Sequence, residues 1–478
     1  MYLLSLLRTE VIRLAKFLRL VHNEYIKAVK KVSTKILFII IALSVLGLMG
    51  IAKISEYQNN QSKNEFLNSL KERDYSEEIS SVLEMKNTGY EFMVEKYQFQ
   101  SDNNIERLSW KESACDTIFD FEIDYDDSGN ETAEYRYSEQ QREEMKKYVL
   151  NDDWKSFCKA VLEILKSSEY SEDAYIWEYE YRINHDIPLP KNFEESINWQ
   201  NTLLNDITEL KRQGAVLESE KTDTNKGDES LNAALEAKYY QLENNIETNV
   251  ADHTSLMGSE VDFWTVFYAS NSLIKLVGAL IIIIAGSTIA SEFSNGTIKF
   301  LLINPVKRWK ILVSKYTMCI SLGYIMLIFL YIVSALLCII FFGTDTLDAQ
   351  HITFLNGEIV EINGFLFIAK SYLLSSVNVV VMATLAFAVS SLVRSSALAI
   401  GVSLFSLLSG SLIVDILKEG FNLDWARYFI FANTDLAAIS NNQTIFSNQT
   451  VSFALTVIAA HMAVFILAAW DGFTKREV

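Results

Sequence analysis

Residue types suited to catalysis are scarce in this sequence of 478 residues, which has five histidines and four cysteines. It contains no phosphate-binding G-x-x-x-x-G-K-[ST] loop, no H-E-x-x-H zinc motif, no C-x-x-C pair and no G-x-S-x-G nucleophile turn. These spacings place phosphate-binding amides, metal ligands or nucleophiles where their chemistry needs them. We therefore expect a chain that is not an enzyme and that carries no metal or cofactor of its own.

One acidic stretch comes closest to a metal site. Residues 124–132 carry Asp, Asp and Ser at alternate positions, followed by Gly and Thr, which resembles the first part of a calcium-binding loop. The bidentate glutamate expected at the twelfth position is replaced by Tyr135. Because apolar and acidic residues alternate over 119–125 and again over 133–137, we favour an acidic turn of a β-hairpin over a calcium site.

The four cysteines fall into two groups. Cys115 and Cys158 lie in a long acidic insertion, where a disulfide can form if that insertion is outside the cell. The sequence does not give their separation, so the bridged and free states both stay open. Cys319 and Cys338 lie in one apolar run and are expected to be packing residues.

Two ionisable residues interrupt apolar runs, which makes each a functional candidate. Lys275 follows Trp264, Phe267 and Tyr268, a group typical of an aromatic belt at the membrane surface. We therefore favour a lysine that snorkels to that surface over a buried functional charge. His461 is interpreted as a helix-packing residue in preference to a proton relay.

The candidate residues in the apolar runs, Lys275, His461, Cys319 and Cys338, would be positioned by membrane-spanning helices. Half of the residues are hydrophobic, and six runs with few or no charges are long enough to cross a bilayer. The fold class is therefore predicted to be an all-α polytopic membrane protein with six transmembrane helices. The predicted spans are 36–52, 276–291, 316–342, 365–393, 397–414 and 450–470.

The net charge of −18 is unevenly distributed along the chain. Residues 53–260 hold about 46 acidic and 22 basic residues, so this insertion is near −24 and the rest is net positive. Basic residues cluster before span one, between spans two and three, at Arg394 between spans four and five, and after span six. By the positive-inside rule, both termini are cytosolic and 53–260 is an extracellular domain. The acidic balance does not favour nucleic acid as a partner.

The first 35 residues are predicted to form an amphipathic helix on the inner leaflet of the membrane. Apolar residues recur at helical spacing, with the basic residues mostly off this stripe. A helix packed on a partner protein is the alternative, and the two are compatible. A cleaved signal peptide is disfavoured because the charged region before span one is too long. The stripe consists of Leu3, Leu7, Val11, Leu14, Leu18 and Val21.

The extracellular domain is predicted to be mainly helical, apart from the β-hairpin described above. Apolar residues recur at heptad-like intervals on both sides of a polar break at 222–229, so 193–250 is predicted to be a helical hairpin. A helix continuing out of span one is its expected packing partner. Ser138 and Gln141 have the spacing of a capping box, which marks a helix start.

The segment after the second span combines a glycine, an apolar run and a proline. Gly296 suits a helix end or a tight turn, and Pro305 suits a second stop. The residues between them are mostly apolar, whereas an ordinary cytosolic loop is polar. An apolar helix exposed to water is unfavourable unless another protein covers it. The segment 291–305 is therefore predicted to include a short helix that binds another protein.

These residues resemble a protein family, the type-2 ABC exporter permeases. The segment that follows their second span is similar to the pattern E-x-x-x-G-T-x-K-x-L-L-x-x-P-x-x-R-x-x-x-x-x-x-K seen here. Asn23-Glu24-x-x-Lys27 is similar to the family's motif before span one, and Phe473-x-Lys-Arg-Glu to its tail. The resemblance covers residues 1–52 and about 261–478, and it does not extend to the insertion. The pattern is matched by Glu292, Gly296, Thr297, Lys299, Leu301, Leu302, Pro305, Arg308 and Lys315.

The resemblance implies a permease subunit in a bacterial plasma membrane that exports an amphiphilic peptide, lipid or drug. It implies a second permease subunit, identical or different, and two separate ATPase chains that bind ATP and Mg. Residues 292–303 would be the coupling helix that sits in a groove of the ATPase. The helix of residues 1–31, with Asn23, Glu24 and Lys27, would be the interfacial helix in contact with membrane lipid.

Two other functions stay open. A mechanotransmitting ABC subunit would act through its external domain and move nothing across, but such proteins usually have four spans. A receptor-like membrane protein would also use the external domain, but it would not need the apolar cytosolic segment. The substrate is not identified by the sequence.

Overall fold

The computed structural model describes residues 17–72, 74–85, 87–125, 131–167, 173–219, 225–250, 261–297, 306–355, 357–393, 395–440, 444–446 and 449–475. The chain forms two compact units. The first unit comprises Met1–Glu56, His253–Asp348 and Asn363–Val478, and the second comprises Tyr57–Asp252 and Ala349–Ile362.

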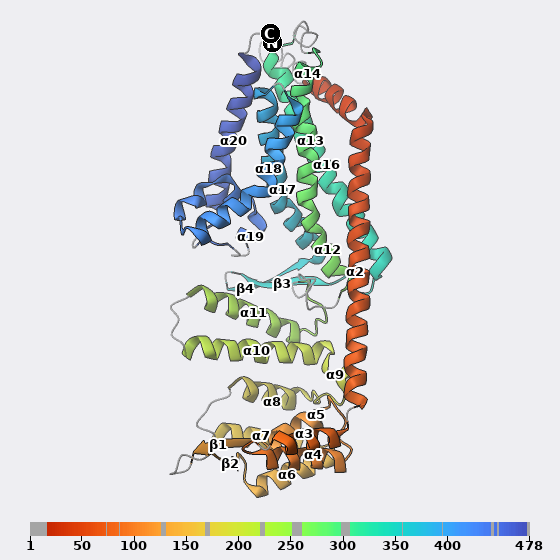
Figure 1. Ribbon diagram of the computed structural model, residues 1–478, viewed down its shortest axis with the longest axis vertical. Coiled ribbons are helices and arrows are strands. Elements are labelled where there is room, and N and C mark those ends of the chain that lie inside the picture. The colour runs from red at the N-terminus through yellow and green to blue at the C-terminus, as the bar shows by residue number, and fades with distance from the viewer. Residues whose placement is uncertain are drawn as a thin grey trace, which may run out of the picture. The chain divides into compact units, whose positions relative to one another are not determined.

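The first unit is a bundle of long apolar helices (Figure 1). Six helical segments among the described residues are long and apolar enough to cross a membrane, which is the number predicted. These segments are Val32–Leu70, Phe263–Ser294, Arg308–Phe342, Gly364–Leu392, Ser396–Gly420 and Val451–Thr474. The helices that form them are α2 (Val32–Glu72), α12 (Phe263–Ala269), α13 (Ile274–Thr288), α14 (Ala290–Ser294), α16 (Arg308–Phe342), α17 (Gly364–Leu392), α18 (Ser396–Asp415) and α20 (Val451–Thr474). Residues 17–30 form a further helix before α2, and α19 (Leu436–Ser440) is short.

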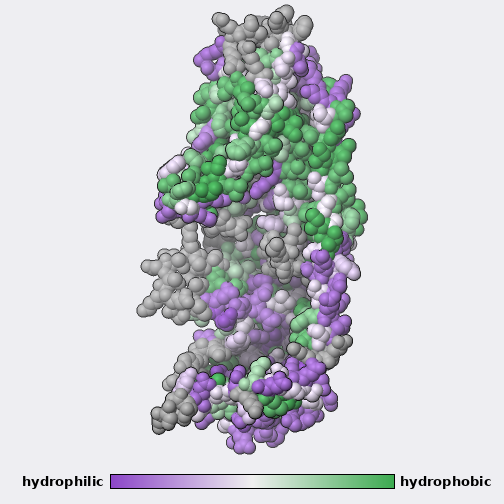
Figure 2. All heavy atoms as spheres, in the orientation of Figure 1, coloured by the Kyte–Doolittle hydropathy of each residue, from purple (hydrophilic) through white to green (hydrophobic). Residues whose placement is uncertain are grey.

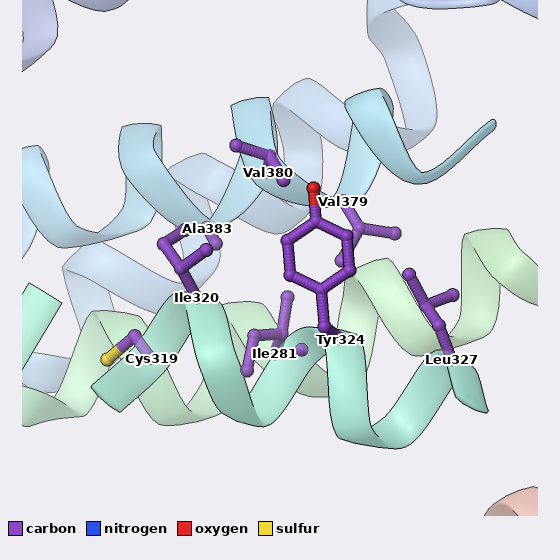
Figure 3. A pocket seen from close by; sticks show the side chains of 9 residues that line it. Ile281, Cys319, Ile320, Tyr324, Leu327, Val379, Val380 and Ala383 are labelled. Carbon is purple, nitrogen blue, oxygen red and sulfur yellow. The ribbon is translucent and has the colours of Figure 1, made fainter. Parts of the chain in front are cut away.

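Helix α17 lies at the centre of this bundle and packs against α13, α16, α18 and α20. Small residues allow the close approach, as is usual between helices in lipid. A Cβ added to Gly472 of α20 would lie 3.2 Å from the backbone oxygen of Ser391 on α17. Figure 3 shows the narrow apolar gap where Ile281 of α13, Tyr324 of α16 and Val379 of α17 meet. The outward faces of these helices are largely hydrophobic, as contact with lipid requires (Figure 2).

The second unit is mostly helical, carries two small sheets and is largely hydrophilic on the face seen in Figure 2. Its helices are α3 (Tyr75–Met85), α4 (Tyr90–Asp102), α5 (Trp110–Ile118), α6 (Glu139–Leu150), α7 (Trp154–Ser167), α8 (Asp173–His185), α9 (Phe193–Ser196), α10 (Trp199–Ser219) and α11 (Asn225–Glu243). One hydrophobic core is built around Trp110, Met145 and Phe157. A second core is built around Leu203, Leu204 and Ile207.

Three predictions for this unit are confirmed. Strands β1 (Phe121–Tyr125) and β2 (Glu131–Tyr135) form the expected antiparallel hairpin, although residues 126–130 of its turn lie outside the described residues. Helices α10 and α11 form the expected helical hairpin. The capping box starts α6, because the Ser138 hydroxyl accepts from the Gln141 amide and Gln141 Oε1 accepts from the Ser138 amide.

Helix α2 does continue beyond span one, and its Lys63 ammonium lies 5.2 Å from the centre of the Phe193 ring, so this helix contacts the segment 193–250 as expected. The side chains packed on the core of α10 come from α8 and α11, including Trp177 and Leu235. Strands β3 (Gln350–Leu355) and β4 (Glu358–Asn363) form a second hairpin between spans three and four, which was not predicted from the sequence. Gly357, directly before β4, has a positive φ of 88°, a conformation that favours glycine and that tight hairpin turns need.

Each cysteine of the chain is free and buried. Burial raises the pKa of the Cys115 thiol and of the Cys158 thiol to about 12, so neither forms the reactive thiolate near neutral pH. The structure therefore favours the free state over the bridged one that the sequence left open. Cys319 and Cys338 are buried on α16, as expected for packing residues.

Candidate functional site

Three segments far apart in the sequence meet around the side chain of Lys315. Its ammonium donates to Glu24 Oε2 at 2.8 Å and to Glu292 Oε1 at 3.2 Å. Glu24 lies on the helix of residues 17–30, Glu292 on α14 and Lys315 on α16. The Lys315 side chain is only 3% exposed, so this double ion pair is buried.

The contacts continue from both carboxylates. Lys27 donates to Glu24 Oε1 at 2.9 Å, and its own side chain is 62% exposed. The Thr297 hydroxyl donates to Glu292 Oε2. We call Lys27, Glu24, Lys315, Glu292 and Thr297 the ion-pair network. It contains two ammonium and two carboxylate groups, so its formal charges balance.

The local backbone explains how Glu292 and Thr297 reach this position. Helix α13 ends at Thr288, and the Ser390 hydroxyl of α17 accepts from the amides of Ile289 and Ala290 at 3.2 and 3.0 Å. This side chain satisfies donors at the break that separates α13 from the short helix α14. Gly296 then has a φ of +70°, a conformation that favours glycine, and its amide donates to Phe293 O at 3.2 Å. The turn predicted at Gly296 is therefore confirmed.

The electrostatics favour the charged form of Glu24 at neutral pH. Burial alone would raise the pKa of Glu24, but the neighbouring Lys315 and Lys27 ammonium groups outweigh it and hold the pKa below its ordinary value. A buried lysine without a partner would be strongly unfavourable. The network is therefore suited to holding the helix of residues 17–30, α14 and α16 in one fixed arrangement rather than to acid–base catalysis.

Several residues of the sequence motifs lie outside the network. Asn23 is exposed, although it belongs to the same motif as Glu24. Arg308 begins α16, and its guanidinium donates to Thr474 O at 3.5 Å, near the chain's tail. The predicted coupling residues Lys299, Leu301, Leu302 and Pro305 lie outside the described residues.

The two polar candidates within the spans also lie apart from the network. Lys275 is exposed in the first turn of α13, where it lines a cavity of about 270 Å³ together with Asn378 and Asp435. His461 is half-buried on α20, and its Nδ1 lies 2.9 Å from the Val457 oxygen of the same helix.

Sequence reasoning singled out the residues of the network by resemblance but did not pair them. Lys315 and Glu24 are 291 positions apart, and no local pattern links them. Ser390 was missed altogether. It is one polar residue in an apolar helix, and nothing in its sequence context distinguishes it from the neighbouring Ser391.

Comparisons with known proteins place the chain in a family. Residues 233–478 match the family described as "Protein of unknown function (DUF2705)". The chain is 33% identical over 272 residues to "Uncharacterized protein YhcI" of Bacillus subtilis (strain 168), covering 56% of this chain and 83% of that protein. It is 33% identical over 222 residues to "Uncharacterized membrane protein YdbK" of the same organism, covering 46% of this chain and 85% of that protein.

The chain belongs to the DUF2705 family, because the family model matches half of it and the first relative is matched over most of its length. The name of the second relative and the six apolar helices agree that this is a membrane protein. The family match begins within α11 and includes Glu292, Thr297 and Lys315. Glu24 and Lys27 lie before it.

Proposed function

We propose that this member of the family is the transmembrane permease subunit of an ATP-driven ABC exporter that moves an amphiphilic substrate. The ion-pair network is the observation that carries this proposal. It joins Glu292 and Thr297 to the helix of residues 17–30 and to α16. The segment 292–303, which resembles a coupling helix, contains both Glu292 and Thr297.

The network gives a physical route for coupling. Breaking a buried ion pair is strongly unfavourable, by about 3–5 kcal/mol, so segments joined by one move together. Force applied to the segment after Thr297 would therefore pass through Glu292 to Lys315 on α16 and to Glu24 on the N-terminal helix. Two ATPase chains, which carry ATP and Mg, would supply that force. A second permease subunit, identical or different, would complete the pathway.

The proposal includes an orientation. By the positive-inside rule, both termini and the network face the cytosol at the plasma membrane, and residues 53–260 form an extracellular domain. The mechanotransmitting and receptor-like alternatives share this orientation, so orientation and coupling need separate tests.

Thiol labelling tests the orientation. A membrane-impermeant maleimide added to intact cells is expected to label Thr224→Cys and not Lys310→Cys. Unmodified chain should remain unlabelled, because Cys115 and Cys158 are buried and the pKa of each is near 12. Permeabilised cells should expose position 310. Labelling of position 310 in intact cells would contradict the proposed orientation.

ATPase coupling tests the function. The chain would be co-expressed and co-purified with a candidate ABC ATPase, and substrate-stimulated ATP hydrolysis would be measured in lipid discs. Gly296→Pro is expected to abolish the stimulation, because proline cannot adopt a φ of +70° and cannot donate to Phe293 O. Leu301→Asp is expected to weaken binding of the ATPase by placing a charge in the apolar segment.

Gly343→Pro is the matched control. Gly343 also has a positive φ of +85° in open space, and its amide donates to Ile339 O at 3.1 Å at the end of α16. This variant loses a positive-φ glycine and a backbone hydrogen bond away from the network, so it should keep the stimulation. If Gly296→Pro and Leu301→Asp, tested as separate variants, each kept the full stimulation of ATP hydrolysis, the segment 291–305 would have no coupling role. That result would favour a receptor-like protein.

A further inference from the structure

A cavity in the second unit combines aromatic and acidic side chains. Its volume is about 400 Å³, and it lies between α8, α11 and β4. This size is within the range of pockets that hold small molecules. The side chains that matter for recognition are Trp177, Tyr181, Tyr239, Tyr240, Glu236 and Glu243.

The rings are held in place by the fold. The Trp177 ring lies 5.4 Å from the Tyr181 ring and 5.4 Å from the Tyr239 ring, the latter in an edge-to-face arrangement. All three pack on the core formed by Leu203, Leu204, Ile207 and Leu242. Rings fixed by a core on one side and bordering a cavity on the other are prepared for a ligand, because little side-chain freedom is lost on binding.

Two carboxylates border the same cavity. Glu236 and Glu243 are exposed, and neither forms an ion pair within the described part of the chain. Burial and the nearby Glu243 carboxylate both raise the pKa of Tyr181, which places that negative charge beside the ring. Tyr240, on α11, donates its hydroxyl to Glu361, so this hydroxyl already has a hydrogen-bond partner within the protein.

The rings already attract a cation of the protein itself. The Lys211 ammonium lies 5.6 Å from the centre of the Trp177 ring and 5.9 Å from that of Tyr239. These distances are within the reach of cation–π attraction. An anion would instead meet two carboxylates in an insertion whose net charge is near −24.

We propose that this cavity binds an organic cation, with the apolar body of the ligand against Trp177, Tyr181 and Tyr239 and its charged nitrogen near Glu236 and Glu243. A neutral apolar ligand would leave the carboxylates unused, and a small inorganic cation would leave the rings unused. The inference does not depend on export or on an ATPase, since it concerns binding alone. Its failure would therefore leave the proposed function untouched.

The test measures binding to the full-length protein in discs of uncharged lipid by isothermal titration calorimetry. Benzyltrimethylammonium is the probe, and benzenesulfonate, which has the same ring and the opposite charge, is its control. Saturable binding is expected for the cation and none for the anion. The double variant Glu236→Gln/Glu243→Gln should weaken binding of the cation about tenfold.

Two further variants separate a built site from general attraction to an acidic surface. Glu247→Gln removes one exposed carboxylate of the same unit that does not line the cavity, so it should leave the affinity unchanged. Tyr181→Leu keeps the two carboxylates and removes one aromatic ring, so it should also weaken binding of the cation. Circular dichroism would confirm that this variant is folded. Equal binding of both probes would overturn the proposal. So would a loss of affinity for the cation in Glu247→Gln as large as the loss in Glu236→Gln/Glu243→Gln.

Discussion

Lys315→Met is expected to destabilise the first unit by about 3–5 kcal/mol, because it leaves one buried and one largely buried carboxylate without their shared cation. The side chains of Glu24 and Glu292 are only 11% and 21% exposed, so water replaces little of the lost interaction. Methionine keeps the length of the side chain and its apolar stem. The measurement is the apparent unfolding temperature of the purified protein in detergent, which should fall by several degrees.

Two controls show whether charge or packing causes the loss. Lys27→Met removes the exposed end of the same network and should change the unfolding temperature little. The triple variant Glu24→Gln/Glu292→Gln/Lys315→Met removes every buried charge and should recover most of the stability. If Lys315→Met behaved like Lys27→Met, the network would not hold the three segments together.

The helices of the first unit could be predicted from the sequence because their signal is local. Long apolar runs predict spans wherever they occur, and six such helices are present. The helix that was predicted to continue beyond span one is also present, because α2 extends past Lys53 to Glu72. Lys53 pairs with Glu56 at 2.7 Å along the same helix, and its ammonium lies 4.4 Å from the centre of the Phe342 ring.

The ion-pair network shows which part of a site the sequence does not determine. Resemblance to a family selected Glu24, Glu292 and Lys315, but their pairing depends on how distant helices pack. Asn23 shows this limit, because it belongs to the same motif and yet lies exposed. The β3–β4 hairpin had a readable signal in Asn356-Gly357, and it was missed because two apolar spans flank it closely.

Arg182→Met is expected to destabilise the second unit by a comparable amount, about 3–5 kcal/mol. Arg182 is 2% exposed and donates to Glu178 Oε1 at 2.9 Å, to Asn201 Oδ1 at 2.8 Å and to Pro188 O at 3.3 Å. One guanidinium thus joins α8, α10 and the connection between them. Its loss leaves a largely buried carboxylate and a buried amide oxygen without their donor. Limited proteolysis of the full chain should show faster cleavage between residues 57 and 252.

Arg212→Met is the matched control for this arginine. Arg212 is 57% exposed and pairs with Glu209 within α10, so its replacement should leave the cleavage rate nearly unchanged. Because Lys315 and Arg182 belong to different compact units and share no partner, each variant should keep its own effect in the double variant. The double variant should show the unfolding temperature of Lys315→Met and the cleavage rate of Arg182→Met between residues 57 and 252. A change of either measurement by the other substitution would show that the two units do not unfold independently, and slow cleavage of Arg182→Met would contradict the role of its guanidinium.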